Sequence, residues 1–329
     1  MPQQYGSVTY GTHSNTEALD LAFSIHTDVD AAFYDMEYPD HDWYKVVEND
    51  QIFSNINPGA TSYGYITRDR HGAATFIGNG PNNNIPMVSQ TAGANTVPVA
   101  YAAVGAVITN EDARQYQFGF NANLANDLGE TMRVACDNLV ENTVFFGNKD
   151  MGFLPFMNYP GISAAMLPEG SGGSTQWSKK TPIEIFSDIN NALVSIWKNS
   201  RTIFKPTTVF VDPDSYALLS QPAVIGNPSS TAVLTSTLEY TLNNATVRRL
   251  TNRPLEIIPL RYLTGAGTGG TNRMIVMDRS RKNQCLPFPM PFTLSQPVPA
   301  DLAAKLFTET KFGSYHVRQQ GSIAYFDGL

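Results

Sequence analysis

Few residues of this chain have types and spacings that could carry chemistry. The stretch GAGTGG, residues 265–270, has the glycine content of a phosphate-binding loop. It lacks the Lys-Ser or Lys-Thr pair of such loops, and a strand pattern rather than a helix pattern comes after it. We therefore interpret it as a flexible loop between strands. Ser215 lies in no Gly-x-Ser-x-Gly arrangement, so it is better explained as a polar residue in the first turn of a helix.

Metal and redox chemistry have little support either. Carboxylates are dense between residues 28 and 42 and could bind a divalent cation, but their spacing matches no calcium loop, which favours a solvated acidic face. The histidines are too far apart along the chain to form a local zinc pair. Cys136 and Cys285 are too few for a disulfide framework, so we expect reduced thiols. The sequence predicts no catalytic, cofactor-binding or metal site, although residues distant in sequence can still meet in a fold.

The charge content limits the class of protein. Only 16% of the residues are charged, against about 25% in a typical soluble protein, as expected where much surface is buried between subunits. The net charge of 22 − 29 = −7 leaves no global electrostatic footprint for nucleic acid. The first residues do not form a signal peptide, and the longest apolar run, residues 97–108, is shorter than the roughly 20 residues of a membrane helix. We expect a soluble protein that is used inside a cell, without a membrane.

A long hairpin is predicted between Asn57 and Thr109. The strand patterns TSYGYITRDR and TVPVAYAAVGAVIT flank the turn-rich segment GNGPNNNIP. This tip is too polar to be core, so we expect the hairpin to project. Residues 1–44, with one candidate short helix near 28–38, are typical of an extended arm. We expect the arm and the tip around residues 78–85 to become ordered through contact with neighbouring chains.

Two helices are predicted after the hairpin. Thr109 and Asp112 form a capping signal for a helix over 110–119. Apolar residues at spacings of three and four then predict a longer helix over 124–146. Gly147 suits the left-handed position that follows a helix end.

An α/β unit is predicted over residues 180–280. Thr181, Pro182 and Glu184 form a capping box that starts a helix running to about Asn199, and Asp212 caps a short helix. Helical patterns there alternate with strand patterns at 207–211, 254–259 and 273–278. From Leu286 onward strand patterns return, and we expect these strands to complete the layer begun by the hairpin and the long helix.

The segment between the long helix and the α/β unit poses a question. Residues 151–159 include six large apolar side chains, yet glycines and prolines prevent a helix or a long strand. Such a segment is either core beneath a loop or a surface that meets another chain. The residues alone leave both interpretations open.

Several blocks of the chain resemble the major capsid proteins of tailed bacteriophages, whose Hong Kong 97-type fold is shared with encapsulin nanocompartment shells. The resemblance covers the chain from about residue 40 to the end. The blocks that carry it are FSNINPGATSYGYITRDRHGAATFIG (53–78), LVENTVFFGNKDMGFLPFMNYPGI (139–162), FVDPDSYALLSQ (210–221) and RSRKNQCLPFPMPFTLSQPVPADL (279–302).

The resemblance implies an α+β, Hong Kong 97-like capsid fold in five parts. These would be an N-terminal arm (1–44), an extended β-hairpin loop with its base (45–108), a peripheral domain with a long spine helix (109–162), an α/β axial domain (163–280), and C-terminal strands of the peripheral domain (281–329). Candidate subunit-interface residues are Arg68, Arg70, Phe76, Phe145, Phe146, Phe153, Phe156 and Tyr159.

The implied function is structural rather than enzymatic. Pentamers and hexamers of the chain would assemble in the bacterial host cytoplasm into an icosahedral virion shell that encloses double-stranded DNA without sequence-specific binding. Implied partners are a scaffolding protein, a portal and a decoration protein. An encapsulin-type shell that packages a cargo enzyme is the alternative, and an enzyme based on the α/β unit is a third. Some relatives join subunits through a lysine on the extended loop, but residues 46–148 contain no lysine here, so a non-covalent shell is predicted.

Overall fold

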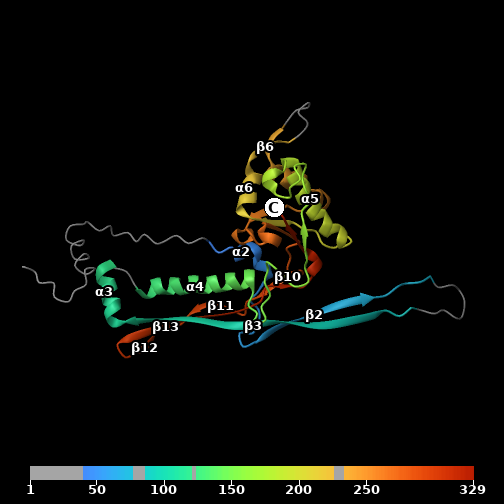
Figure 1. Cartoon of the computed structure of the whole chain (residues 1–329). Helices are drawn as coiled ribbons and strands as arrows, with labels where there is room; N and C mark the ends of the chain where they lie inside the picture. Colours follow the sequence, from blue (N-terminus) through green and yellow to red (C-terminus); the bar gives the residue numbers. More distant parts are fainter. Residues whose placement is uncertain (1–39, 77–85, 121–123, 226–232) are drawn as a thin grey trace, which may run out of the picture.

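A long flat layer carries a rounder body on its middle (Figure 1). The computed structural model describes residues 40–76, 86–120, 124–225 and 233–329. The helix proposed near 28–38, most of the N-terminal arm and most of the hairpin tip lie outside these residues. The long helix lies within them, as do both strands of the hairpin and the predicted α/β unit apart from residues 226–232.

The long layer is built on the predicted hairpin. Strands β2 (Ser62–His71) and β3 (Ser89–Thr109) pair antiparallel, with Ser62 opposite Pro98 and His71 opposite Ser89. Strand β13 (Ala303–Gly313) is paired along its whole length with the other edge of β3, where it lies opposite residues 99–109. The sheet order is β11-β13-β3-β2, with β11 (Met290–Leu294), and β12 (Val298–Ala300) pairs with β13. Figure 1 shows β2 and the adjoining half of β3 extending far beyond the body.

Helix α4 lies along this sheet, and helix α3 stands at one end of it (Figure 1). Helix α3 (Asn110–Phe120) follows β3 directly, and the backbone amide of Asp112 donates to Thr109 Oγ1 at 3.1 Å, as the capping signal predicted. Helix α4 (Leu124–Phe146) has the predicted bounds and lies along β3 and β13 (Figure 1). Met132 of α4 packs on Ile108 and Leu306 because alternate strand residues face the helix.

The body is an α/β unit around a five-stranded sheet of order β4-β15-β9-β5-β8. Its own apolar core lies between this sheet and α5, with Ile189 and Leu193 fully buried. Its elements are β4 (Ala164–Met166), α5 (Pro182–Asn199), β5 (Thr208–Val211), α6 (Pro213–Ser220), β6 (Pro222–Ile225), β7 (Val233–Ser236), α7 (Thr237–Asn244), α8 (Thr246–Thr251), β8 (Glu256–Pro259), β9 (Arg273–Met277) and β15 (Ile323–Asp327).

The helix starts of this body follow the predicted capping chemistry. The side chain of Glu184 accepts from the backbone amide of Thr181 at 2.8 Å, which closes the capping box of α5. Asp212 Oδ2 accepts from the amide of Ser215 at 3.0 Å and caps α6. Ser215 is thus the polar first-turn residue that the sequence predicted.

The prediction for the C-terminal strands is right for β11 and β13 and wrong for the last strand. β15 leaves the long layer and pairs antiparallel with β9 and parallel with β4. Its side chains pack both on the apolar core inside the body and on the apolar core between the body and the long layer. The carboxylate of Asp327 pairs with Arg273 of β9 at 2.7 Å. Burial and a buried ion pair therefore place this strand in the body.

A small sheet ties the first described residues to the later chain. β1 (Ile52–Phe53) pairs parallel with β10 (Gln284–Pro287), and β10 pairs antiparallel with β14 (His316–Val317). Before it, the short helix α2 (Trp43–Val46) buries its tryptophan in the central core. Within the described residues no helix is both long enough and apolar enough to cross a membrane.

Candidate subunit interface and the junction that positions it

The eight candidate interface residues fall into two groups. Four are buried within the subunit, with exposed fractions of 5% or less: Phe145, Phe153, Phe156 and Tyr159. The other four are exposed to solvent: Arg68, Arg70, Phe76 and Phe146. Only the second group is available to another chain in this conformation.

The buried group results from a sharp chain reversal after α4. Gly147 has φ = 71°, and a Cβ there would lie 2.6 Å from the carbonyl oxygen of Phe153, so the turn requires glycine. Asn148 and Phe153 exchange two backbone hydrogen bonds, of 3.0 and 2.7 Å. The chain then runs back under the helix end, where the amide of Phe156 donates to the carbonyl of Val144 at 2.9 Å. Phe153, Phe156, Met157 and Tyr159 of the apolar segment are therefore core beneath a loop, whereas Met151 is 54% exposed.

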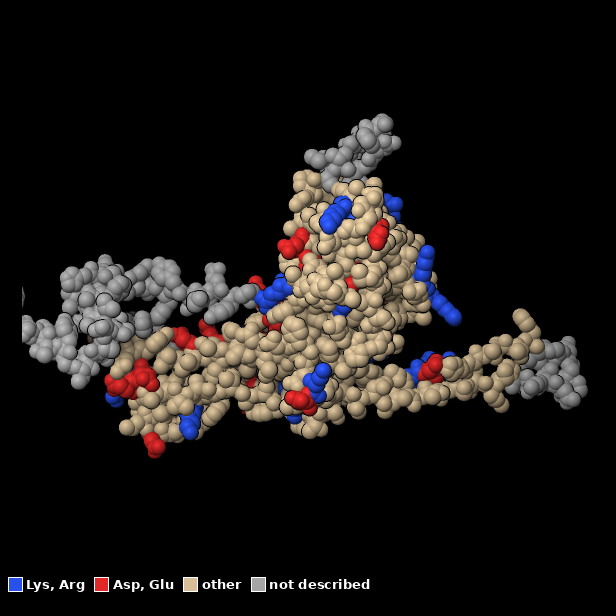
Figure 2. Space-filling model, in the orientation of Figure 1, with Lys and Arg blue, Asp and Glu red and all other residues tan. Residues whose placement is uncertain are grey.

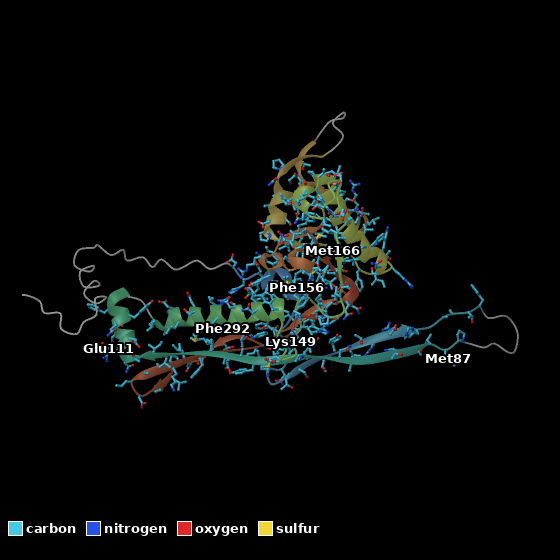
Figure 3. The ribbon with its side chains drawn as sticks, in the orientation of Figure 1. Met87, Glu111, Lys149, Phe156, Met166 and Phe292 are labelled. Atoms are coloured by element: carbon cyan, nitrogen blue, oxygen red, sulfur yellow. The ribbon has the colours of Figure 1, made fainter. Side chains whose placement is uncertain are left out.

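An aromatic cluster fills the space where the layer meets the body. The Phe156 ring meets Phe145, Phe210 and Tyr315 edge-on, with centroids 6.1, 6.0 and 5.3 Å away. Figure 3 shows Phe156 at this junction, between the layer and the body that carries Met166. These contacts join α4, β5 and the loop before β14, so a single core positions both parts of the molecule.

Phe146 points the other way from its buried neighbour. Its ring is 58% exposed and meets Tyr262 edge-on at 5.4 Å, whereas Phe145 is fully buried and packs on the same tyrosine at 4.4 Å. The two adjacent phenylalanines thus have different roles at the helix end. Phe145 anchors α4 to the body, and Phe146 presents an aromatic surface beside the anchor.

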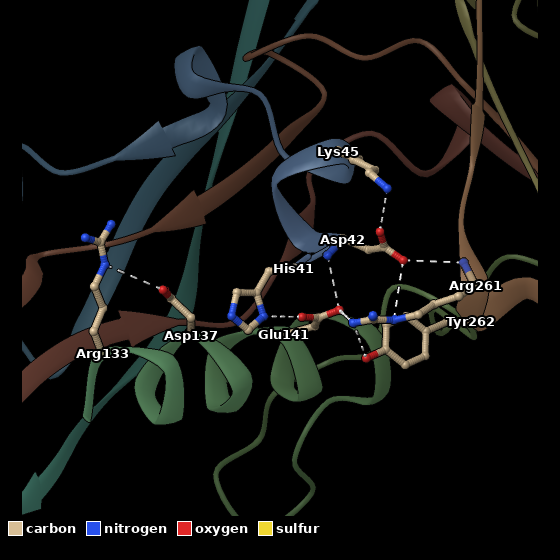
Figure 4. A network of polar contacts seen from close by, with 8 residues as sticks. All are labelled: His41, Asp42, Lys45, Arg133, Asp137, Glu141, Arg261 and Tyr262. Atoms are coloured by element: carbon tan, nitrogen blue, oxygen red, sulfur yellow. Dashed lines mark hydrogen bonds and ion pairs between the residues drawn. The ribbon is translucent and has the colours of Figure 1, made fainter. Parts of the chain in front are cut away.

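A polar network beside this cluster binds three segments together (Figure 4). Glu141 of α4 is buried, and its carboxylate contacts Nδ1 of His41 at 2.6 Å and Nη2 of Arg261 at 2.6 Å. The backbone amide of Asp42 also donates to it, at 3.2 Å. Asp42 in turn pairs with Lys45 at 2.7 Å. The network fixes the start of the described chain against the spine helix and the body.

The electrostatics of Glu141 follow from these donors. Burial alone would raise its pKa, but hydrogen bonds from His41, the Asp42 amide and Arg261 outweigh burial and hold the pKa below its usual value. The carboxylate is therefore ionised at neutral pH and holds two cationic or polar partners. This buried ion pair is a structural joint, since it links α4 to the start of the described chain and to the body.

The acidic segment is only partly a solvated face. Asp42 is 4% exposed and paired, which differs from the prediction, because the backbone of Arg261 and two cations lie close enough to satisfy it. Asp28, Asp30, Asp35 and Glu37 lie outside the described residues. Within the described part of the chain, no three His, Cys, Asp or Glu residues cluster as a metal site would require.

A second joint at the root of the hairpin could not be read from the sequence. The hydroxyl of Tyr65 on β2 lies 2.8 Å from His316 Nε2, and the Tyr159 hydroxyl lies 3.1 Å from Nδ1 of the same ring. The Arg318 guanidinium lies over the Tyr65 ring at 4.9 Å and donates to the Tyr63 hydroxyl at 2.9 Å. Burial, with a contribution from Arg318, lowers the pKa of His316, which favours the neutral ring.

The projecting part of the hairpin is exposed on all sides. Arg68 and Arg70 lie on the far half of β2, and Phe76 and Met87 at its end have exposed fractions of 109% and 89%. Figure 3 places Met87 at one end of the layer and Glu111 at the opposite end. Figure 2 shows a face that is largely uncharged, with acidic atoms gathered at the α3 end. The hairpin offers both an apolar end and two arginines to a neighbour.

The glycine-rich stretch lies between β8 and β9, as its interpretation as a loop between strands predicted, and here it forms a hydrogen-bonded turn. Gly269 and Gly270 have positive φ, and the amide and hydroxyl of Thr268 both donate to Asp327 Oδ2 at 2.8 Å. Strand β9 follows directly. The loop therefore closes on the buried Arg273–Asp327 pair.

A family model matches most of this chain, and solved capsid structures share its fold. A family model described as "Major capsid protein" matches residues 72–329. The capsid of Myoviridae Phage XM1 superposes with a TM-score of 0.72 at 14% identity and covers 93% of this chain and 98% of its own. The capsid of a native GTA particle gives 0.55 at 9% identity, with coverages of 96% and 99%. A chain of Microbacterium phage Oxtober96 gives 0.58 at 13% identity, with coverages of 95% and 98%. No curated protein sequence matches significantly.

Proposed function

The chain belongs to the major capsid protein family and is a structural protein of a phage capsid shell, and from this premise we propose how it builds that shell. Copies assemble as pentamers and hexamers into an icosahedral shell around double-stranded DNA. The observation that carries the proposal is the exposed hairpin of β2 and β3, which extends far beyond its own subunit (Figure 1). Within the described part of the chain the outer edge of β2 pairs with no strand, and such an exposed edge can gain burial by lying on a neighbour.

The exposed candidate residues supply the contacts in this proposal. Phe76 and Phe146 bury apolar area against adjacent subunits, and Arg68 and Arg70 pair with carboxylates there. Each exposed ion pair contributes at most about 1 kcal/mol. Affinity therefore comes from many modest contacts repeated around a closed shell. The four buried aromatics act indirectly, because they hold the hairpin and the body in one orientation.

The parts of the subunit divide the work. Residues 1–44 serve as the arm, 45–108 as the extended loop with its base, 109–162 as the peripheral domain, 163–280 as the axial domain and 281–329 as the C-terminal strands of the peripheral domain. Within this last part, β15 pairs with β9, which supports counting that strand with the axial domain. Assembly takes place in the host cytoplasm with a scaffolding protein and a portal, a decoration protein binds outside, and the shell has no enzymatic activity.

Particle formation tests the proposal directly. The chain is expressed alone and with a scaffolding partner, and the lysate is examined by sedimentation and electron microscopy. Closed shells tens of nanometres across are expected. Replacing residues 69–91 by a two-residue Asn-Gly turn keeps Tyr65 and the paired residues Arg68 and Ala92, and it should abolish the shells while leaving a folded subunit. The control is the exposed substitution Arg114→Gln on α3, which should leave assembly unchanged. A chain that stays monomeric at high concentration in both settings would contradict the proposal. Empty shells that recruit a cargo enzyme instead of DNA would favour an encapsulin-type compartment.

A further inference from the structure

The projecting hairpin is held at its root by side chains of β2. Strand β13 supports β3 only as far as Val99, which lies opposite Gly313. From there toward the tip, β2 and β3 pair only with each other within the described part of the chain. Tyr65 lies opposite Asn95, beyond the supported part of β3, and its hydroxyl contacts Nε2 of His316 at 2.8 Å. This contact therefore helps to set the angle at which the hairpin leaves the layer.

Tyr65 is also the outermost contact of this kind. Tyr63 and Tyr65 are half-buried on one face of β2, whereas residues 68–71 are exposed. Among the described residues, no β2 side chain beyond Tyr65 forms a hydrogen bond with a part of the subunit outside β2 and β3. The Tyr63 hydroxyl accepts from Arg318 at 2.9 Å. His316 and Arg318 thus hold neighbouring tyrosines at the root of the hairpin.

The hydrogen bonds of His316 suit a neutral ring. The Tyr65 hydroxyl lies at Nε2, and the Tyr159 hydroxyl lies 3.1 Å from Nδ1. A neutral imidazole has one N–H group and one lone pair, so it donates to one hydroxyl and accepts from the other. A charged ring has no lone pair, so one hydroxyl hydrogen must find another acceptor. The Val317 carbonyl, 3.5 Å from the Tyr159 hydroxyl, is too distant for a good bond.

No carboxylate compensates for a charge on this ring. Among the described histidines, His41 and His71 pair with carboxylates at 2.6 and 2.8 Å, whereas His316 pairs with none. The titratable groups around it are Tyr63, Tyr65, Tyr159, Arg318 and Cys285, which lies opposite His316 on β10. Burial raises the pKa of Cys285 to about 11 and that of Tyr159 to about 12. The thiol and the phenols are therefore neutral at pH 7, and only Arg318 is charged.

Arg318 makes a second positive charge costly. Its guanidinium lies 4.9 Å from the centre of the Tyr65 ring, and the His316 ring lies 5.6 Å from the same centre. Burial and then this positive charge lower the pKa of His316. A solvated histidine has a pKa near 6.5. The stability of the closed joint is therefore complete above about pH 6.5 and is lost as the pH falls through the pKa of the closed joint.

We propose that His316 is a pH-dependent lock on the hairpin: the neutral ring holds Tyr65, and protonation in mildly acidic solution releases it. Residues 62–71 and 89–98 then move as one paired unit, because β3 stays joined to β13 from Val99 onward. Release changes the angle of the hairpin and leaves the layer folded. The lock acts within one subunit and needs no assembly.

Distances between spin labels on unassembled subunits test the lock. Labels are placed at Arg70→Cys on the hairpin and Lys198→Cys on α5, both exposed, while the native Cys136 and Cys285 are buried. A narrow distance distribution is expected at pH 7.5 and a second, shifted population at pH 5.5. The ratio of released to locked subunits should rise at most about tenfold for each unit by which the closed joint lowers the pKa of His316. Identical distributions at both pH values would overturn the proposal.

A reference pair of labels separates release from other effects of acid. Glu130→Cys on α4 with Lys198→Cys should give one distance at both pH values, because the body stays fixed on the layer. A parallel change in this pair would show general loosening and would overturn the lock.

Substitutions identify the titrating group. His316→Gln should remove the pH dependence, whereas His71→Gln, on the same hairpin, should leave it unchanged. Tyr65→Phe breaks the contact without changing charge and should show the released population already at pH 7.5, which tests the lock even if His316→Gln fails to fold. Persistent pH dependence in His316→Gln, or a locked Tyr65→Phe, would contradict the proposal.

Nuclear magnetic resonance of the His316 ring measures its titration directly. The ring should titrate below pH 6.5 in the wild type, and Arg318→Gln should raise its pKa and reduce the acid-induced release. Titration at or above pH 6.5 in the wild type, or a pKa unchanged by Arg318→Gln, would refute the role assigned to Arg318 and to burial.

Discussion

Arg261 Nη2 and Glu141 Oε1 lie 2.6 Å apart and join the long helix α4 to the α/β body. His41 contacts the other carboxylate oxygen of Glu141, so one buried side chain also holds the start of the described chain. The orientation of the body on the layer therefore depends on a charge as well as on the aromatic cluster. Such a joint responds to pH in a way that apolar packing does not.

Replacing Glu141 by Gln should destabilise the unassembled subunit by about 1–3 kcal/mol at pH 7, because Arg261 and His41 lose a charged acceptor. The folded-state pKa of Glu141 lies below its usual value. Its contribution is therefore present above the unfolded pKa, near 4.3, and is lost as the pH falls through the folded pKa. Urea unfolding at pH 7 and between pH 5 and 3 measures this, and the difference between wild type and variant should shrink with acid. Glu130→Gln, exposed on the same helix, is the control; a constant difference at all pH values would refute the electrostatic explanation.

The adjacent phenylalanines at the end of α4 should behave differently. Phe145→Ala removes a fully buried ring and should cost about 3–5 kcal/mol in the unfolding of the subunit. Phe146→Ala removes a ring that is 58% exposed, so the subunit should lose about 1 kcal/mol or less. Shell yield should nevertheless fall in Phe146→Ala if neighbours cover that ring. Thermal unfolding of subunits and particle counts by electron microscopy separate the two effects. Unchanged yield would place Phe146 outside the interface.

The buried pair of Arg273 and Asp327 should hold the last strand in the body. The guanidinium makes two contacts with the carboxylate, at 2.7 and 2.9 Å. Arg273→Gln leaves that carboxylate without its cation and should cost about 3–5 kcal/mol, measured by urea unfolding. Arg114→Gln, whose partner Glu111 is exposed and 3.8 Å away, should cost less than about 1 kcal/mol. Equal losses of stability from the two substitutions would show that burial does not make the Arg273–Asp327 pair stronger than the exposed Arg114–Glu111 pair.

The shell should be held together without covalent bonds. No lysine occurs between residues 46 and 148, and the basic residues Arg68 and Arg70 of β2 stay protonated and are not nucleophiles. Mature particles boiled in detergent should run as one band near the 36.0 kDa of the chain, or lower if the arm is trimmed. A ladder of pentamers and hexamers would disprove this prediction.

The elements with local signals could be predicted from the sequence. The bounds of α4 follow from its apolar stripe and from Gly147, and the start of α5 follows from Thr181 and Glu184. In both cases the determining contacts lie within a few residues of each other. The hairpin is predicted for the same reason, since its two strands are neighbours along the chain.

Contacts between distant residues could not be predicted in this way. Phe156 and Phe146 are the same residue type in the same segment, and only the chain reversal at Gly147 buries one and exposes the other. The joint of Tyr65 with His316 spans 251 positions, and no local pattern marks it.

The position of β15 has a consequence for synthesis. β15 lies between β4 and β9, and β4 pairs with no strand except β15 among the described residues. The sheet of the body therefore cannot be completed until residues 323–327 have been translated, and such long-range pairing is slow to form. Until then the surfaces that depend on the body are incomplete. A nascent chain therefore lacks these surfaces until β15 has been made and has paired with β4 and β9.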